Sequence, residues 1–280
     1  MRLPDEPQAV LARRAGLMLR PPPGLLRLVR HRGDLEWHWI SAGPVAPGRV
    51  VLWFHGGAFV AGSPVIYAAM LGRLARLAGV EVCAPRYPLA QETPFPAAPD
   101  TAMAAWEGLL ALGYRPGDIV IAGDSAGGGL AAGLLARVLT GGARPAGLLL
   151  FSPWADLVLA GDSLAANGPR DPFLPVERIG EIVALYLQGA DPADPRASPV
   201  LAAYPGAPPA LIQAGADEAL LSDAVRLAAR LRAGGGTVAL DLWAGCPHVW
   251  QLFDGWLPES RLALRAAARF VQASFASTSR

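Results

Sequence analysis

The stretch VIAGDSAGGGLAAG, residues 120–133, indicates the class of the fold. It overlaps a short apolar run, DIVIAG at 118–123, and continues into AGGGLAAGLLARVL, which has a helical pattern. A short apolar run followed at once by a helix is typical of a buried strand that leads into a helix. Ser125 stands at the junction between Gly123 and Gly127, where a side chain would crowd so sharp a turn. Gly-x-Ser-x-Gly in this setting predicts a nucleophile that projects from the carboxyl edge of a sheet.

Short apolar runs and longer helical patterns alternate along the rest of the chain. Runs that are apolar throughout suit strands covered on both faces, as in a parallel sheet. The sequence therefore predicts an α/β fold, with a mostly parallel central sheet flanked by helices. Strands are expected at 35–41, 49–54, 80–85, 118–123, 146–152, 209–215 and 237–243, and helices near 65–78, 97–112, 126–140, 176–188, 218–233 and 259–275.

One long segment interrupts this alternation. Residues 153–208 contain proline-rich turns and one helical pattern, but no strand signal. Such an excursion between two strands predicts an insertion over the carboxyl edge of the sheet. We therefore expect a catalytic domain over 41–280 with a helical cap insertion at about 155–205, and an N-terminal cap segment over 1–40. The triple proline at 21–23 favours a flap packed on the body over a membrane-surface helix.

Composition argues against several classes of protein. The formal net charge is +1, so nothing points to nucleic acid. Two cysteines without a CxxC pattern are too few for a disulfide framework or a metal knot, and neither a metal nor a cofactor is expected. No apolar run approaches the ~18 residues of a membrane span. The N-terminus lacks the features of a signal peptide, which predicts a cytoplasmic protein without stable membrane insertion.

A serine hydroxyl becomes a good nucleophile only when a base accepts its proton. His248, in AGCPHVWQ just after the last predicted strand, is the only one of the four histidines that follows Ser125. The chain order of serine, acid and histidine in hydrolases of this type requires such a residue. His248 is therefore the predicted base. The others, His31, His38 and His55, precede the serine.

An acid that orients the imidazole is expected between Ser125 and His248, at the carboxyl end of a strand. Asp217 directly follows PALIQAGA and is preferred on position. Asp156, after LLLFSPWA, is its rival, and Asp223 and Glu218 are further alternatives.

The segment LWFHGGAFVAG, residues 52–62, supplies backbone amides directly after a predicted strand. Amides aimed at one point stabilise the oxyanion that forms during acyl transfer. We expect the amides of Gly56, Gly57 and Ala126 to form this oxyanion hole. His55 is expected to hold the loop in place rather than act as a base.

Five motifs occur in the order and spacing of the hormone-sensitive-lipase-like esterases, which are bacterial carboxylesterases of the α/β-hydrolase fold. They are HGGAF, GDSAGGG, SPWADL, GADEALLSD and PHVW, and RYPLAQETPFPAA at 86–98 also resembles a segment of that family. The resemblance covers roughly residues 45–275. The sequence departs from the family at Ala58, in place of the third glycine of the oxyanion motif, and at Arg86 and Pro88, where relatives form a salt bridge.

The resemblance implies hydrolysis of short- to medium-chain carboxylic esters through an acyl-enzyme. Ser125 would attack the ester, His248 would transfer the proton, and Asp217 would orient His248. It also implies a cap over the site, with Phe59, Trp154, Tyr186 and Trp250 as candidate pocket walls, and a homodimer through the last strand, TVALDLW. The alternatives are a lactone or amide hydrolase with the same triad, or a non-catalytic small-molecule receptor, which the presence of His248 disfavours.

Overall fold

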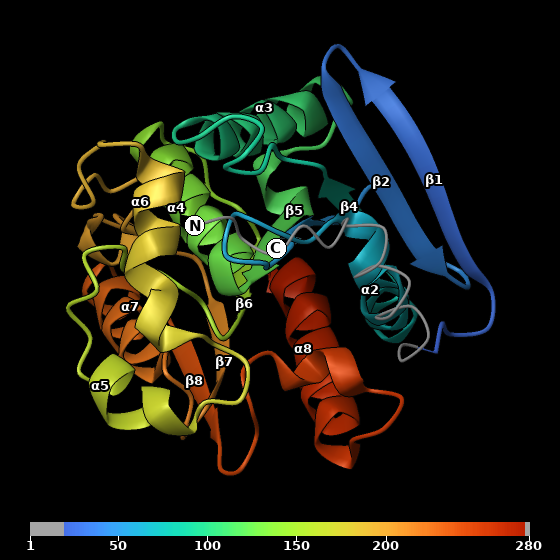
Figure 1. The fold of residues 1–280 in the computed structure, drawn as a ribbon. Coiled ribbons are helices and arrows are strands. Elements are labelled where there is room, and N and C mark those ends of the chain that lie inside the picture. The colour runs from blue at the N-terminus through green and yellow to red at the C-terminus, as the bar shows by residue number, and fades with distance from the viewer. Residues whose placement is uncertain (1–19, 278–280) are drawn as a thin grey trace.

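An eight-stranded sheet runs through the molecule in the order β1-β2-β4-β3-β5-β6-β7-β8 (Figure 1). The structure is a computed structural model that describes residues 20–277. The strands from β3 to β8 are parallel, whereas β2 pairs antiparallel with both β1 and β4. The strands are β1 (Leu25–Arg32), β2 (Leu35–Ala42), β3 (Val50–Phe54), β4 (Glu81–Pro85), β5 (Ile119–Asp124), β6 (Gly147–Phe151), β7 (Ala210–Gly215) and β8 (Val238–Trp243).

Helices cover both faces of this sheet (Figure 1). One face packs against α2 (Pro64–Ala78) and α8 (Pro258–Ser277). The other packs against α3 (Ala97–Ala111), α4 (Ser125–Thr140) and α7 (Leu221–Ala233). The short helices α5 (Ser163–Asn167) and α6 (Ile179–Leu187) belong to the segment between β6 and β7.

The buried strands explain why the sequence pattern was informative. Every residue of β3, β5, β6 and β7 is buried, because helices cover both faces of these central strands. The predicted α/β fold and its mostly parallel sheet are confirmed. Each predicted strand and helix has a counterpart within a few residues of its expected bounds.

The N-terminal prediction needs a correction. Residues 25–40 do not form a cap, because β1 and most of β2 lie there as an antiparallel hairpin that extends the main sheet. Strand β1 was missed because its arginines interrupt the apolar pattern and its side chains are largely exposed. The part of the expected cap at 1–19 lies outside the described residues.

The expected insertion contains only helices and turns between Pro153 and Pro208. Its helix α6 contacts the loop that follows β3. Tyr186 of α6 stacks face to face on Phe59, with ring centroids 3.9 Å apart and planes inclined by 6°. The Phe95 amide also donates to the Tyr186 carbonyl oxygen at 2.9 Å. Helix α6 therefore packs against the HGGAF loop.

Within residues 20–277, no helix is both long and apolar enough to cross a membrane.

Candidate active site

Ser125 lies at the turn where β5 passes into α4, in a left-handed backbone conformation with φ of 51°. This conformation is costly for a residue with a side chain and is typical of functional sites. The flanking glycines are required because the backbones approach closely. A Cβ on Gly123 would lie 2.3 Å from the Gly127 carbonyl oxygen, and one on Gly127 would lie 2.1 Å from the Phe54 carbonyl oxygen. The predicted sharp turn is confirmed in these contacts.

His248 reaches Ser125 from the loop that follows β8. Its Nε2 atom lies 2.9 Å from the Ser125 Oγ atom, and both side chains are buried. The hydroxyl donates to Nε2 when Nδ1 carries the imidazole proton, which is the arrangement that a general base needs. The structure thus brings together the two residues that the sequence selected from positions 123 residues apart.

The structure does not bring Asp217 to His248, and the prediction that it orients the imidazole is corrected. The Asp217 side chain is exposed, and its Oδ2 atom accepts a long hydrogen bond of 3.4 Å from the Gly245 amide. The carboxylate that faces the histidine belongs to the next residue, Glu218, which is only 2% exposed. Its Oε2 atom lies 3.8 Å from His248 Nδ1.

Glu218 is held from two sides. The Ser152 hydroxyl donates to Glu218 Oε2 at 2.7 Å, and the Gly215 amide donates to the same oxygen at 3.1 Å. Among the described residues, neither Glu218 Oε1 nor His248 Nδ1 has a hydrogen-bond partner. These two atoms belong to neighbouring buried side chains, and each is costly to leave unpaired. A separation of 3.8 Å is too long for a hydrogen bond, but catalytic contacts often tighten only when substrate binds.

Ser152 joins the acid to the histidine loop. Besides donating to Glu218, its hydroxyl accepts a hydrogen bond of 3.2 Å from the Val249 amide, next to His248. Ser152 itself has φ of 44°, at the end of β6, and is fully buried. The sequence showed it only as the first letter of SPWADL, so no local signal indicated this role.

The other two acids considered from the sequence have structural partners. Asp223 accepts the amides of Ala155 and Asp156 at 2.8 and 2.9 Å, which fixes the start of the insertion. Burial is the main reason that the pKa of Asp223 is raised to about 7. Asp156 pairs with Arg226. Neither carboxylate is paired with His248.

The oxyanion prediction is partly corrected. The Gly56 amide donates to Asp124 Oδ1 at 3.1 Å, so it is not free to bind an oxyanion. In the part of the chain that the structure describes, no acceptor is bonded to the amides of Gly57, Ala58 or Ala126. The Ala126 amide lies in the first turn of α4, where helical amides have no intrahelical partner. Gly57, Ala58 and Ala126 are therefore the donors available to a developing oxyanion.

Asp124 joins the oxyanion loop to the nucleophile turn. This buried carboxylate accepts hydrogen bonds from Gly56, from Trp53 Nε1 at 3.2 Å and from the Tyr67 hydroxyl at 2.8 Å. Burial raises the pKa of Asp124 to about 7, although these donors act in the opposite direction. The sequence had shown this residue only as the second letter of GDSAG.

His55 holds the same loop in place, as expected. Its Nδ1 atom lies 2.8 Å from the Gly56 carbonyl oxygen, and the Tyr87 hydroxyl donates to the His55 carbonyl oxygen at 2.7 Å. The two rings stack with centroids 4.3 Å apart. Burial lowers the pKa of His55 to about 4, so the imidazole is neutral at pH 7.

Three of the four candidate pocket walls lie together. Phe59 stacks on Tyr186 and lies 5.9 Å from Trp154, measured between ring centroids. Trp250 does not join them. It is fully buried in a separate cluster with Cys246 and Ala263, beside Trp243, and this position is the correction to its predicted role.

The segment in which Arg86 and Pro88 depart from the family pattern contains a local ion pair. Arg86 pairs with Glu92, and the second Glu92 oxygen accepts the Leu89 amide at 3.0 Å. No group of three or more His, Cys, Asp or Glu side chains within residues 20–277 is arranged to hold a metal ion.

Comparisons with known proteins agree with this geometry. A family profile described as the alpha/beta hydrolase fold matches residues 51–252. An acetyl-hydrolase of Streptomyces hygroscopicus is 38% identical over 256 residues, which cover 90% of this chain and 83% of the relative. An esterase of Acinetobacter venetianus is 36% identical over 224 residues, which cover 79% and 74%.

Two solved structures that match this chain are also of esterases. The crystal structure of an esterase from the bacterial hormone-sensitive lipase family matches with a TM-score of 0.93 and 37% identity, over 98% of this chain and 93% of that one. An esterase/lipase from an uncultured bacterium matches with a TM-score of 0.90 and 33% identity, over 98% and 94%. The chain therefore belongs to the α/β-hydrolase fold family and, within it, to the hormone-sensitive-lipase-like esterases.

Proposed function

We propose that this protein is a serine carboxylesterase in which Ser125, His248 and Glu218 form the catalytic triad. The observation that carries the proposal is the 2.9 Å contact between Ser125 Oγ and His248 Nε2, at a strained turn that faces unbonded amides. Glu218 takes the role first expected of Asp217, because it is the buried carboxylate beside His248. This arrangement supports acyl transfer to a serine followed by hydrolysis.

The reaction follows from these positions. Ser125 Oγ attacks the carbonyl carbon of the ester while its proton passes to His248 Nε2. The carbonyl oxygen becomes an oxyanion, which the amides of Gly57, Ala58 and Ala126 stabilise. Collapse of this intermediate breaks the bond to the alcohol, which takes the proton from His248. Water then attacks the acyl-enzyme by the same route and releases the acid. Glu218 stabilises the imidazolium that forms in each half of the reaction.

The proposed substrates are carboxylic esters with short to medium acyl chains. The aromatic side chains of Phe59, Trp154 and Tyr186 pack closely beside the oxyanion loop and form a bulky wall there. The similarity to an acetyl-hydrolase is a second support for a small acyl group. No residue of the site requires a cofactor for this chemistry.

The direct test is the initial rate of hydrolysis of p-nitrophenyl esters from C2 to C16. We expect a maximum at the short esters, and a loss of at least ~10⁵-fold in kcat for Ser125→Ala, because the serine and histidine act as a unit. Labelling by a fluorophosphonate probe should mark wild type but not Ser125→Ala. Equal rates in both proteins would contradict the assignment of the nucleophile. Labelling of a folded protein that turns over lactones or amides, but no ester, would contradict the substrate class.

Two further proposals, a homodimer and a cytoplasmic location, come from the sequence. Among residues 20–277, strand β8 pairs only with β7, so no described strand covers its outer edge, and Leu242 on it is 45% exposed. An open edge with an apolar side chain suits pairing with a second copy. Sedimentation should show a dimer that Leu242→Asp dissociates, and a monomeric wild type would contradict the first proposal. Fractionation of the producing cells tests the second.

A further inference from the structure

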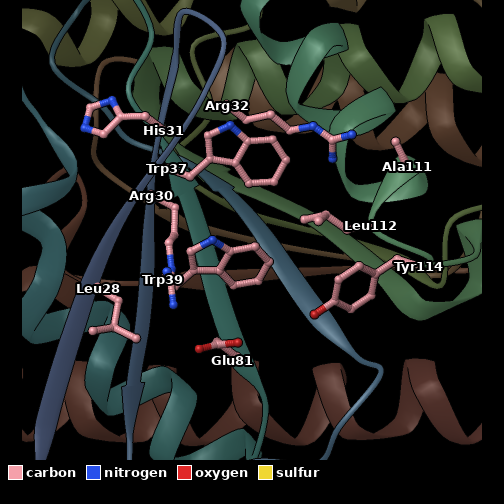
Figure 2. Close-up of a pocket in the computed structure, with 10 residues that line it drawn as sticks. All are labelled: Leu28, Arg30, His31, Arg32, Trp37, Trp39, Glu81, Ala111, Leu112 and Tyr114. Carbon is pink, nitrogen blue, oxygen red and sulfur yellow. The ribbon is translucent and has the colours of Figure 1, made fainter.

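A second concave site lies beside the β1–β2 hairpin, at one edge of the sheet. Figure 2 shows a groove between the β1–β2 hairpin and the segment that ends α3. Its volume is about 730 Å³, within the range of small-molecule sites. The groove runs along the hairpin from the level of Pro85, which pairs with Trp37, to Glu81, the first residue of β4. Neither Ser125 nor His248 is among the residues that line it, so the groove is separate from the catalytic site.

Aromatic rings form one wall of the groove. Trp37 and Trp39 project from the same face of β2, and their ring centroids are 5.9 Å apart with planes inclined by 25°. Trp39 also stacks on Tyr114, with centroids 6.4 Å apart and an angle of 21°. Trp39 is only partly buried, so part of its ring is accessible from the groove. Such a wall accepts a planar ring by stacking.

The groove also presents one cationic side chain, Arg30, that has no partner among the described residues. Arg30 pairs with Trp37 in the β1–β2 register and therefore lies on the same face. Figure 2 shows its guanidinium beside Trp39, and it has no ion-pair or hydrogen-bond partner among the described residues. Arg32 adds positive charge at the hairpin end, where it donates to the Gly108 carbonyl oxygen at 3.3 Å.

The acidic residue of the groove is not paired with Arg30. The backbone of Glu81 lies about four strand residues, roughly 13 Å, from the level of Arg30 and Trp37. Among the described residues, Glu81 forms no ion pair or hydrogen bond with the Arg30 guanidinium. Arg30 is therefore available to the anionic group of a ligand.

We propose that this groove binds a small planar aromatic carboxylate, whose ring stacks on Trp39 and Tyr114 and whose carboxylate pairs with Arg30. An arginine and a carboxylate form two parallel hydrogen bonds in a fixed geometry, so the charge selects the ligand and orients its ring. The aromatic wall and the unpartnered cation favour this class over a neutral apolar ligand, which would gain no charged hydrogen bond from Arg30.

The test uses the full-length protein and 2-naphthoate as the probe, with binding followed by calorimetry and tryptophan fluorescence. We expect one molecule bound per chain. Neutral 2-naphthylmethanol should bind at least about tenfold more weakly, because it cannot form the charged hydrogen bonds. Arg30→Met should weaken 2-naphthoate at least about tenfold and change 2-naphthylmethanol little. The matched control, Arg269→Met on the exposed side of α8, should change neither affinity by more than about twofold.

Several results would overturn the proposal. They are no binding of 2-naphthoate at millimolar concentration, equal binding of the acid and the alcohol, or an affinity that Arg30→Met leaves unchanged. Trp39→Leu should also weaken 2-naphthoate, and an unchanged affinity in that variant would remove the stacking wall from the site. A dimer that Leu112→Arg dissociates would show that the groove is an interface between copies instead. Ester hydrolysis should be the same in Arg30→Met and wild type, so failure here leaves the catalytic assignment untouched.

Discussion

The nucleophile and its acid are positioned in two different ways. Around Ser125, backbone packs on backbone, and a single added carbon on Gly127 would lie 2.1 Å from the Phe54 carbonyl oxygen. Around Glu218, the contacts are side-chain hydrogen bonds, mainly through the Ser152 hydroxyl. Backbone packing of the first kind restricts the residue type at each position and leaves a motif. Side-chain contacts of the second kind leave no such motif. The sequence alone therefore does not show which of two adjacent acids orients the histidine.

The strongest test of the catalytic acid replaces each of the two neighbouring carboxylates in turn by its amide. Glu218→Gln should lower kcat by about 10⁴-fold, as the corresponding change does in a protease triad, because the imidazolium loses its counter-charge and its tautomer is no longer fixed. Asp217→Asn should lower kcat by less than about threefold, because this side chain is exposed and bonds only to the Gly245 amide. Steady-state kinetics on a short p-nitrophenyl ester measure both. The reverse ranking would restore Asp217 as the triad acid.

For the close backbone contacts of the oxyanion loop, we expect a smaller but still large loss of kcat on substitution of Gly57. This residue has φ of +121°, and a Cβ there would lie 2.1 Å from the Ala61 carbonyl oxygen. Gly57→Ala should therefore displace the loop and lose an oxyanion donor, which lowers kcat by about 10²–10³-fold.

Gly113→Ala is the control for backbone strain alone. Gly113 also has a positive φ, of +96°, but a Cβ there meets no atom within 4 Å. It should cost stability and leave kcat per folded molecule nearly unchanged, with active sites counted by fluorophosphonate titration. A normal kcat in Gly57→Ala would mean that close backbone contact does not define the oxyanion hole.

Ser152 offers an intermediate test of the side-chain network. Ser152→Ala removes one hydrogen bond to Glu218 and one from the Val249 amide, so kcat should fall by roughly 10- to 100-fold while KM changes little. The matched control is Ser163→Ala, because Ser163 is also buried and donates to the Ala219 carbonyl oxygen, but lies in the insertion. Equal losses of kcat in both variants would show that Ser152 contributes only to packing.

The smallest expected effect concerns the pH dependence of stability at Asp124. Its pKa is about 7 in the folded protein, raised from 3.8 mainly by burial, so the folded state holds a proton that the unfolded chain has already released. Stability from this group is therefore present below pH 3.8 and is lost as the pH rises through about 7. Between pH 6 and 7 the wild type should lose about 1 kcal/mol relative to Asp124→Asn. Urea unfolding measures the difference, and parallel stability curves would show that Asp124 is ionised throughout.

The sequence by itself determined the features that depend on local pattern. Continuous apolar runs identified the central strands, because strands buried on both faces have no polar face to reveal. The glycines of GDSAG and HGGAF marked Ser125 and the oxyanion loop, because no side chain fits where the backbones meet. The position of His248 after the last strand identified the base.

Tertiary structure alone decided which groups face one another across the sheet. Asp217 and Glu218 are adjacent in sequence, and only the Ser152 hydroxyl and the buried histidine loop select the second. The Gly56 amide bonds to Asp124 instead of a substrate, although it stands in the expected motif. Strand β1, with its exposed side chains, exists because β2 offers it a hydrogen-bonding edge. These contacts join residues far apart in the chain, and a local pattern does not record which partners the fold will bring together.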